Sequence, residues 1–124
     1  MSKLLVIDDE KLARVTMRKI LERAGHEVVE ATNGVEGVDL YRAGKFDLVI
    51  TDIIMPDKEG VETIMELTRD FPDVRIIAIS GGGRTRNLDF LKLAKQHGAK
   101  QVLAKPFSQS DLVNMVNAVL AEPR

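Results

Sequence analysis

Hydrophobic residues along this chain follow two alternating spacings. Short apolar runs rich in β-branched residues occupy residues 3–7, 27–31, 48–50, 74–79 and 101–104. Runs of this length predict strands, and the run at 48–50 reads as a strand that is buried on both faces. Between the runs, apolar positions recur every three or four residues, which is the spacing of an amphipathic helix. The pattern therefore predicts strands and helices in strict alternation.

Five helices are predicted between and after these strands. The first helix has an apolar face made of Ala13, Met17, Ile20, Leu21 and Ala24, and Gly25 stands just beyond the end of the helix. The second covers residues 35–43, the third begins near residue 59 and ends before residue 71, and the fourth covers residues 85–97. The last helix has its apolar face at Leu112, Val113, Val116, Val119 and Leu120.

Five strands that alternate with five helices predict the α/β class, with a doubly wound parallel sheet covered by helices on both faces. Right-handed crossovers with helices on both faces require the strand order to reverse once. We expect the flavodoxin-like order 2-1-3-4-5, with the switch point between the first and third strands. No linker or low-complexity segment interrupts the pattern, so residues 1–124 are expected to form a single domain.

Composition narrows the function classes. The 124 residues carry 18 Lys and Arg against 19 Asp and Glu, and this net charge of −1 gives no electrostatic reason to expect direct nucleic-acid binding. The absence of cysteine excludes disulfides, zinc–thiolate sites and thiol nucleophiles. No apolar run reaches the length of a membrane span. A cytoplasmic protein that does not enter a membrane is the expectation.

Polar side chains follow the predicted strand ends. Asp8 and Asp9 follow the first strand, Asp52 ends the third, Ser80 ends the fourth and Lys105 follows the fifth. Parallel strands place their carboxyl ends at one edge, where ligands bind in open α/β sheets. Each residue alone has a simpler explanation, as a helix cap, a turn residue or a solvated lysine. Their joint occurrence at one edge favours a functional site.

The chemistry of this site follows from its charges. Three carboxylates that converge repel one another, which should raise at least one pKa. Mg²⁺ suits such a set because it is a hard cation that prefers oxygen ligands. Lys105 adds a second positive charge and Ser80 adds a hydroxyl donor. A carboxylate nucleophile with these partners suits phosphoryl transfer to Asp52.

The chain resembles the receiver domains of two-component response regulators over essentially its whole length. The resemblance is carried by the pair Asp8 and Asp9 and by Asp52, and further by Met55, Pro56, Gly60, Ser80, Lys105, Pro106 and Phe107. It implies that Asp9, Asp52 and the backbone carbonyl of Ile54 ligate Mg²⁺, while Asp8 acts mainly through water. It also implies a cis Lys105–Pro106 peptide bond.

The resemblance further implies a phosphoacceptor. Asp52 would take a phosphoryl group from a sensor histidine kinase or a phosphotransfer protein, Lys105 would hold a phosphoryl oxygen, and the Ser80 hydroxyl would move toward it. The output would be a downstream protein target or an output domain of a longer protein. The domain would not be an enzyme in the usual sense, because it catalyses only its own phosphorylation and dephosphorylation.

Three features depart from the family pattern. The position three residues before the lysine is usually aromatic, but here it is Val102, which is too short to signal by a ring flip. Glycines 81–83 follow Ser80, so residues 80–91 are predicted to carry the signal instead. Lys100 and Gln101 replace an acidic pair that supports dimers in some relatives, and a monomer or weak dimer is expected.

Three alternatives stay open. A haloacid-dehalogenase-type phosphatase also uses a strand-end aspartate, but it expects a second aspartate where this chain has Ile54. A flavodoxin-like flavin carrier needs a phosphate-friendly first loop, whereas Asp8, Asp9 and Glu10 would repel a phosphate. The third alternative is a receiver-shaped interaction module that is never phosphorylated.

Overall fold

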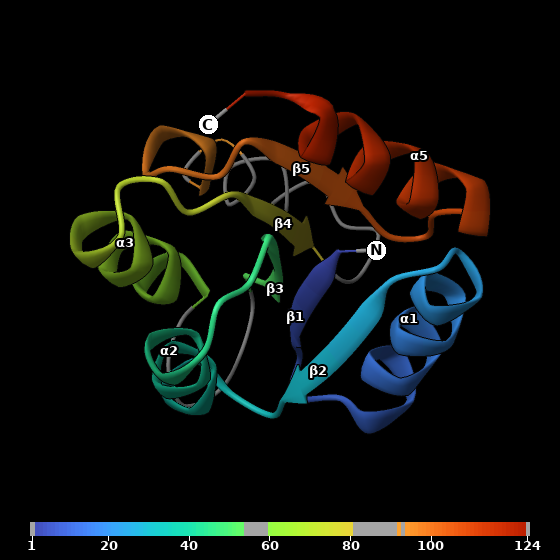
Figure 1. Ribbon diagram of the computed structural model, residues 1–124, viewed down its shortest axis with the longest axis horizontal. Helices are drawn as coiled ribbons and strands as arrows, with labels where there is room; N and C mark the ends of the chain where they lie inside the picture. The colour runs from blue at the N-terminus through green and yellow to red at the C-terminus, as the bar shows by residue number, and fades with distance from the viewer. Residues whose placement is uncertain (1, 54–59, 81–91, 93, 124) are drawn as a thin grey trace.

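The computed structural model describes residues 2–53, 60–80, 92 and 94–123. From β1 to β4, strands and helices alternate along these residues, and β5 and α5 complete the described elements (Figure 1). The elements are β1 (Lys3–Ile7), α1 (Lys11–Arg23), β2 (Glu27–Ala31), α2 (Gly34–Ala43), β3 (Leu48–Asp52), α3 (Gly60–Asp70), β4 (Ile76–Ser80), β5 (Gln101–Ala104) and α5 (Gln109–Ala121).

The five strands form one parallel sheet in the order β2-β1-β3-β4-β5. This confirms the predicted α/β class and the flavodoxin-like order. β1 pairs with β2 on one side and with β3 on the other, so the order of the strands reverses between them. Helices α1 and α5 lie on one face of the sheet, and α2 and α3 lie on the other (Figure 1).

The central strands are buried on both faces because two apolar clusters enclose them. Leu5, Val49 and Ile76 point toward the cluster that contains Val38 of α2 and Ile64 of α3. The other cluster joins the sheet to α1 and α5 through Leu4, Val6, Ile50, Met17, Leu21, Leu112, Val116 and Val119. This burial on both faces explains why the strands read as continuous apolar runs.

Most of the predicted apolar faces of α1 and α5 are buried. Met17 and Leu21 of α1 are buried, while Ile20 is half-buried. The prediction for Ala24 was wrong: this residue is exposed because it stands at the end of the helix. Gly25 follows with φ +96°, a left-handed conformation that favours glycine and ends the helix.

Several predicted boundaries were slightly wrong. β4 begins at Ile76 rather than at residue 74, because the Val74 amide donates to the Phe71 carbonyl at 3.0 Å in the turn after α3. α2 begins one residue early, at Gly34, where the Asn33 side chain accepts from the Glu36 amide. Of the predicted fourth helix, residues 92 and 94–97 are described; residues 92 and 94–96 are helical, and residue 97 already lies in a turn. Among the described residues, the longest helices are too short to cross a membrane.

Candidate functional site

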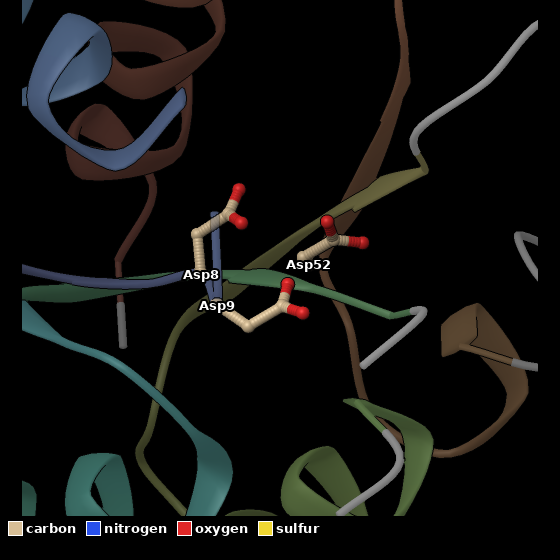
Figure 2. Close-up of side chains that lie close together, drawn as sticks. All are labelled: Asp8, Asp9 and Asp52. Carbon is tan, nitrogen blue, oxygen red and sulfur yellow. The ribbon is translucent and has the colours of Figure 1, made fainter. Parts of the chain in front are cut away.

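The polar residues predicted at the strand ends lie at one edge of the sheet. Asp8 and Asp9 follow β1 directly, and Asp52 is the last residue of β3. Carboxylate oxygens of these three aspartates lie within 4.8 Å of one another. Figure 2 shows the three side chains gathered at the ends of these neighbouring strands. The sequence therefore predicted the acidic cluster correctly.

Burial differs sharply within this cluster. The side chain of Asp8 is fully buried and Asp52 is 6% exposed, whereas Asp9 is exposed. Ser80, the last residue of β4, is 1% exposed. Its hydroxyl has no hydrogen-bond partner among the described residues. The site thus combines one solvent-facing carboxylate with two that are largely shielded from water.

Lys105 brings the positive charge that the sequence predicted. Its Nζ lies 3.6 Å from Asp8 Oδ2 and 4.0 Å from Asp52 Oδ2. The backbone places it, because the Lys105 amide donates to the Ser80 carbonyl at 2.9 Å and so continues the pairing of β5 with β4. The Lys105–Pro106 peptide bond is cis, as the resemblance implied.

The pKa of Asp8 is raised above its ordinary value of 3.8. Burial is the largest cause, because it removes water from the charged form. The Glu10 amide, which donates to Asp8 Oδ1 at 2.9 Å, and the charge of Lys105 oppose the increase. Repulsion from Asp9 contributes less than burial does. The expected direction is confirmed, but burial rather than mutual repulsion is the main reason.

The donor set fits a hard divalent cation. Asp8 Oδ2 is buried and has no hydrogen-bond partner among the described residues, although Lys105 lies near it. An orphaned carboxylate oxygen beside two further carboxylates is suited to Mg²⁺ and its bound waters. Ile54, whose carbonyl was predicted as a ligand, lies outside the described residues, as do residues 81–91 of the segment that was predicted to carry the signal.

The simpler explanation of the first acidic pair fails. Glu10 stands at the N-cap position of α1, and its side chain makes no capping hydrogen bond. Asp8 accepts from the Glu10 amide within the loop rather than capping the helix.

Val102, which stands where the family usually has an aromatic residue, pairs with Ala78 of β4. It packs against the apolar cluster on the side of the sheet that α2 and α3 cover.

Sequence reasoning missed two charged residues beside the site. Arg14 of α1 donates from Nη1 to the backbone carbonyl of Asp8 at 2.9 Å. Its Nε donates to Glu30 of β2 at 2.8 Å. The available signal was weak: an arginine in the helix after the acidic pair, and the second of two glutamates in a short strand.

Comparison with known proteins identifies the family. A family model described as "Response regulator receiver domain" matches residues 4–117. The chain belongs to the response regulator receiver family. This receiver domain is 36% identical over 118 residues to the chemotaxis protein CheY of Thermotoga maritima, and the match covers 94% of this chain and 96% of CheY.

Two further similarities help to place this receiver domain. The crystal structure of TrrA from Thermotoga maritima, described as a complex with Mg²⁺ and BeF, has a TM-score of 0.85 and 29% identity, covering 96% of this chain and 99% of TrrA. The transcriptional regulator NtrC of Azospirillum brasilense is 35% identical over 117 residues, which cover 94% of this chain but only 24% of NtrC. Receiver domains thus occur both alone and within longer regulators.

Proposed function

We propose that this receiver domain is a phosphoacceptor, which takes a phosphoryl group onto Asp52 from the phosphohistidine of a sensor histidine kinase or phosphotransfer protein. The observation that carries the proposal is the position of Asp52. Its carboxylate ends a central strand, lies beside Asp8 and Asp9, and has the Lys105 Nζ at 4.0 Å. A carboxylate held at a sheet edge between acidic residues and a lysine is suited to accept a phosphoryl group.

In the proposed reaction, an Asp52 carboxylate oxygen attacks phosphorus and forms a P–O bond. The bond from phosphorus to the imidazole nitrogen breaks, and its electron pair stays on that nitrogen. The positive charge of Lys105 stabilises the negative charge on the phosphoryl oxygens. Hydrolysis of the resulting acyl phosphate would restore the Asp52 carboxylate and end the signal.

Mg²⁺ is the proposed cofactor. Asp9, Asp52 and the carbonyl of Ile54 would hold it, with Asp8 acting through a bound water. Bound Mg²⁺ would neutralise charge on the phosphoryl oxygens. The support for this proposal is the donor set: the three aspartates offer carboxylate oxygens within 4.8 Å of one another, and Oδ2 of Asp8 has no hydrogen-bond partner among the described residues. The Mg²⁺ and BeF in the TrrA structure agree with it.

Ser80 is proposed to register the phosphorylated state. Its hydroxyl is buried at the end of β4 and has no hydrogen-bond partner among the described residues. A hydrogen bond from such a buried donor to a phosphoryl oxygen would stabilise the phosphorylated state. The residue is therefore available for the role that the resemblance assigned to it.

The output is proposed to be a changed protein-binding surface. Its target is either a separate downstream protein or an output domain of a longer chain, and the NtrC relative is an example of a receiver sequence within a much longer regulator. In this role the domain acts on itself and not on a separate substrate. Residues 1–124 as a single domain, a cytoplasmic location, and a monomer or weak dimer stay predictions.

Labelling with acetyl phosphate and Mg²⁺, followed by intact mass measurement, tests the proposal. The native chain should gain the mass of one phosphoryl group, and the adduct should survive acid and be lost in base. Asp52→Asn should abolish the gain because an amide is a poor nucleophile. Asp73→Asn, at an exposed aspartate after α3, is the matched control and should be labelled normally. Continuous turnover of small phosphoesters would instead favour a phosphatase.

A further inference from the structure

Asp8 is held by three hydrogen bonds, and one of them reaches the peptide that joins Asp8 to Asp9. The Asp8 amide donates to the Ala31 carbonyl at 3.1 Å, at the end of β2. Its carbonyl accepts from Arg14 Nη1 at 2.9 Å, and its carboxylate oxygen Oδ1 accepts from the Glu10 amide at 2.9 Å. Both backbone polar groups of Asp8 are therefore satisfied, and one of them depends on a side chain that is six residues away.

Arg14 is itself held in place by Glu30. Arg14 Nε lies 2.8 Å from Glu30 Oε1, and the arginine side chain is only 11% exposed. Glu30 is opposite Val6 in the register of β2 and β1, two residues before Asp8, so its carboxylate lies close to the end of β1. The fork of the guanidinium lets one side chain reach the carboxylate and the carbonyl together.

Planarity of the peptide bond carries this restraint to Asp9. The Asp8 carbonyl and the Asp9 amide share one rigid plane, so fixing the carbonyl also fixes the direction in which the chain enters Asp9. Residues 8 and 9 belong neither to β1 nor to α1. Regular hydrogen bonding within β1 or α1 therefore does not set the orientation of this plane. Among the described residues, the Arg14 side chain donates the hydrogen bond that reaches it.

We propose that Arg14 is a positioning residue, which orients the Asp8–Asp9 peptide and thereby places the two carboxylates for binding a divalent cation. Glu30 acts through Arg14, because it holds the guanidinium in place. The part of this proposal that concerns the cation rests on the proposed function. Arg14 contacts the backbone of Asp8 rather than the cation or the phosphoryl group. Outer contacts that orient metal ligands typically change metal affinity by about 10- to 100-fold when they are removed.

Arg18 supplies a matched control from the same helix. Arg18 Nη1 lies 2.6 Å from Glu30 Oε2, so Arg18 and Arg14 pair with the same carboxylate one turn apart. Of the two, only Arg14 is hydrogen-bonded to Asp8. A purely structural role in tying α1 to β2 would make the two arginines similar, whereas a positioning role makes them different.

The test compares Arg14→Lys with Arg18→Lys. Both substitutions keep the positive charge but replace the several donors of the guanidinium with a single ammonium group. Mg²⁺ affinity is measured by calorimetry at a temperature where every variant is folded. Arg14→Lys should weaken binding by about 10-fold or more, while Arg18→Lys should leave it close to native. The pair Arg14→Gln and Arg18→Gln, each lacking one charge, repeats the comparison in case lysine preserves both contacts.

A second measurement needs no metal. Amide hydrogen exchange at Asp9 and Glu10 in the metal-free chain should be faster in the Arg14 variants than in the Arg18 variants. Glu30→Gln should also weaken Mg²⁺ binding in the native background but add little to Arg14→Gln, because Glu30 acts through Arg14.

The proposal would be overturned if the Arg14 variant and the Arg18 variant had equal Mg²⁺ affinities and equal exchange rates in both the lysine pair and the glutamine pair. A native chain that binds no Mg²⁺ would overturn the proposed function together with the cation part of this inference. The exchange rates would then still decide whether Arg14 orders the peptide.

Discussion

Lys105 Nζ lies 3.6 Å from Asp8 Oδ2, a buried carboxylate oxygen with no hydrogen-bond partner among the described residues. Among the described residues, Lys105 is the cation that forms an ion pair with Asp8, the most buried carboxylate of the site. It lies slightly farther, at 4.0 Å, from Asp52 Oδ2. One ammonium group therefore offsets charge on both carboxylates while staying within reach of the position that a phosphoryl group on Asp52 would occupy.

Lys105→Met should slow phosphorylation of Asp52 by acetyl phosphate by about 100- to 1,000-fold, the usual effect of removing one group that stabilises developing negative charge. Mg²⁺ binding should be retained or become tighter, because a competing positive charge is lost. Initial rates at saturating Mg²⁺ and a calorimetric titration measure the two effects. A variant that is phosphorylated at the native rate would contradict the role of Lys105.

Asp8→Asn should stabilise the metal-free fold at neutral pH. Burial raises the pKa of Asp8, so the contribution of this residue to stability is fully present below its unfolded-state pKa and is lost as pH rises through its folded-state pKa. Asparagine keeps the acceptor for the Glu10 amide and removes the buried charge. Urea unfolding across this pH range should show a smaller decline for the variant.

Asp9→Asn is the control for this experiment, because the exposed side chain of Asp9 keeps its contact with water. Added Mg²⁺ should stabilise the native chain by about 2.7 kcal/mol at a hundredfold excess over its dissociation constant, and the gain should be smaller in both variants. An Asp8→Asn variant that is less stable than the native chain without metal would contradict the account.

Gly60→Ala should destabilise the fold by roughly 1–3 kcal/mol, the usual cost of overpacking. A Cβ at Gly60 would lie 2.2 Å from the Asp52 carbonyl oxygen and 2.2 Å from Ile53 Cα, and these backbone atoms cannot move aside independently. Gly44→Ala is the control, since its Cβ would come no closer than 3.3 Å to a neighbouring atom. Equal unfolding free energies for the two variants would show that α3 can shift away from Asp52.

Asp70→Asn should change acid unfolding without affecting the site. Hydrogen bonds from Arg69 and Arg42 lower the pKa of Asp70 from 3.8 to about 2. A lowered folded-state pKa contributes stability above the unfolded-state value and loses it as pH falls toward about 2. The difference in unfolding free energy between native and variant chains should therefore shrink over this range, and high salt should reduce it throughout.

The sheet could be predicted because strands buried on both faces leave continuous apolar runs, as at residues 48–50 of β3. The acidic cluster could be predicted because parallel strands bring Asp8 and Asp52 to one edge. The sequence could not show which member of the pair Asp8 and Asp9 would be buried, since both lie beyond the last strand residue. For that reason the cause of the raised pKa was misjudged.

The contact between Arg14 and Glu30 could not be predicted for a different reason. The two residues are 16 positions apart, and α1 also carries Lys11, Arg18, Lys19 and Arg23 as candidate partners. Which of these residues reaches Glu30 depends on how α1 is rotated about its axis against the sheet. The apolar face sets that rotation too coarsely to choose between neighbouring basic side chains. The backbone carbonyl of Asp8 leaves no sequence signal at all.

The central claim is that Asp52 accepts the phosphoryl group, and the most direct test locates the group itself. Borohydride reduction converts an acyl phosphate on aspartate to homoserine, and mass spectrometry of the resulting peptides finds where homoserine stands. After labelling with acetyl phosphate and Mg²⁺, we predict homoserine at position 52, with Asp8 and Asp9 unchanged. Homoserine at position 8 or 9, or its absence from a chain that carries a phosphoryl group, would contradict the account.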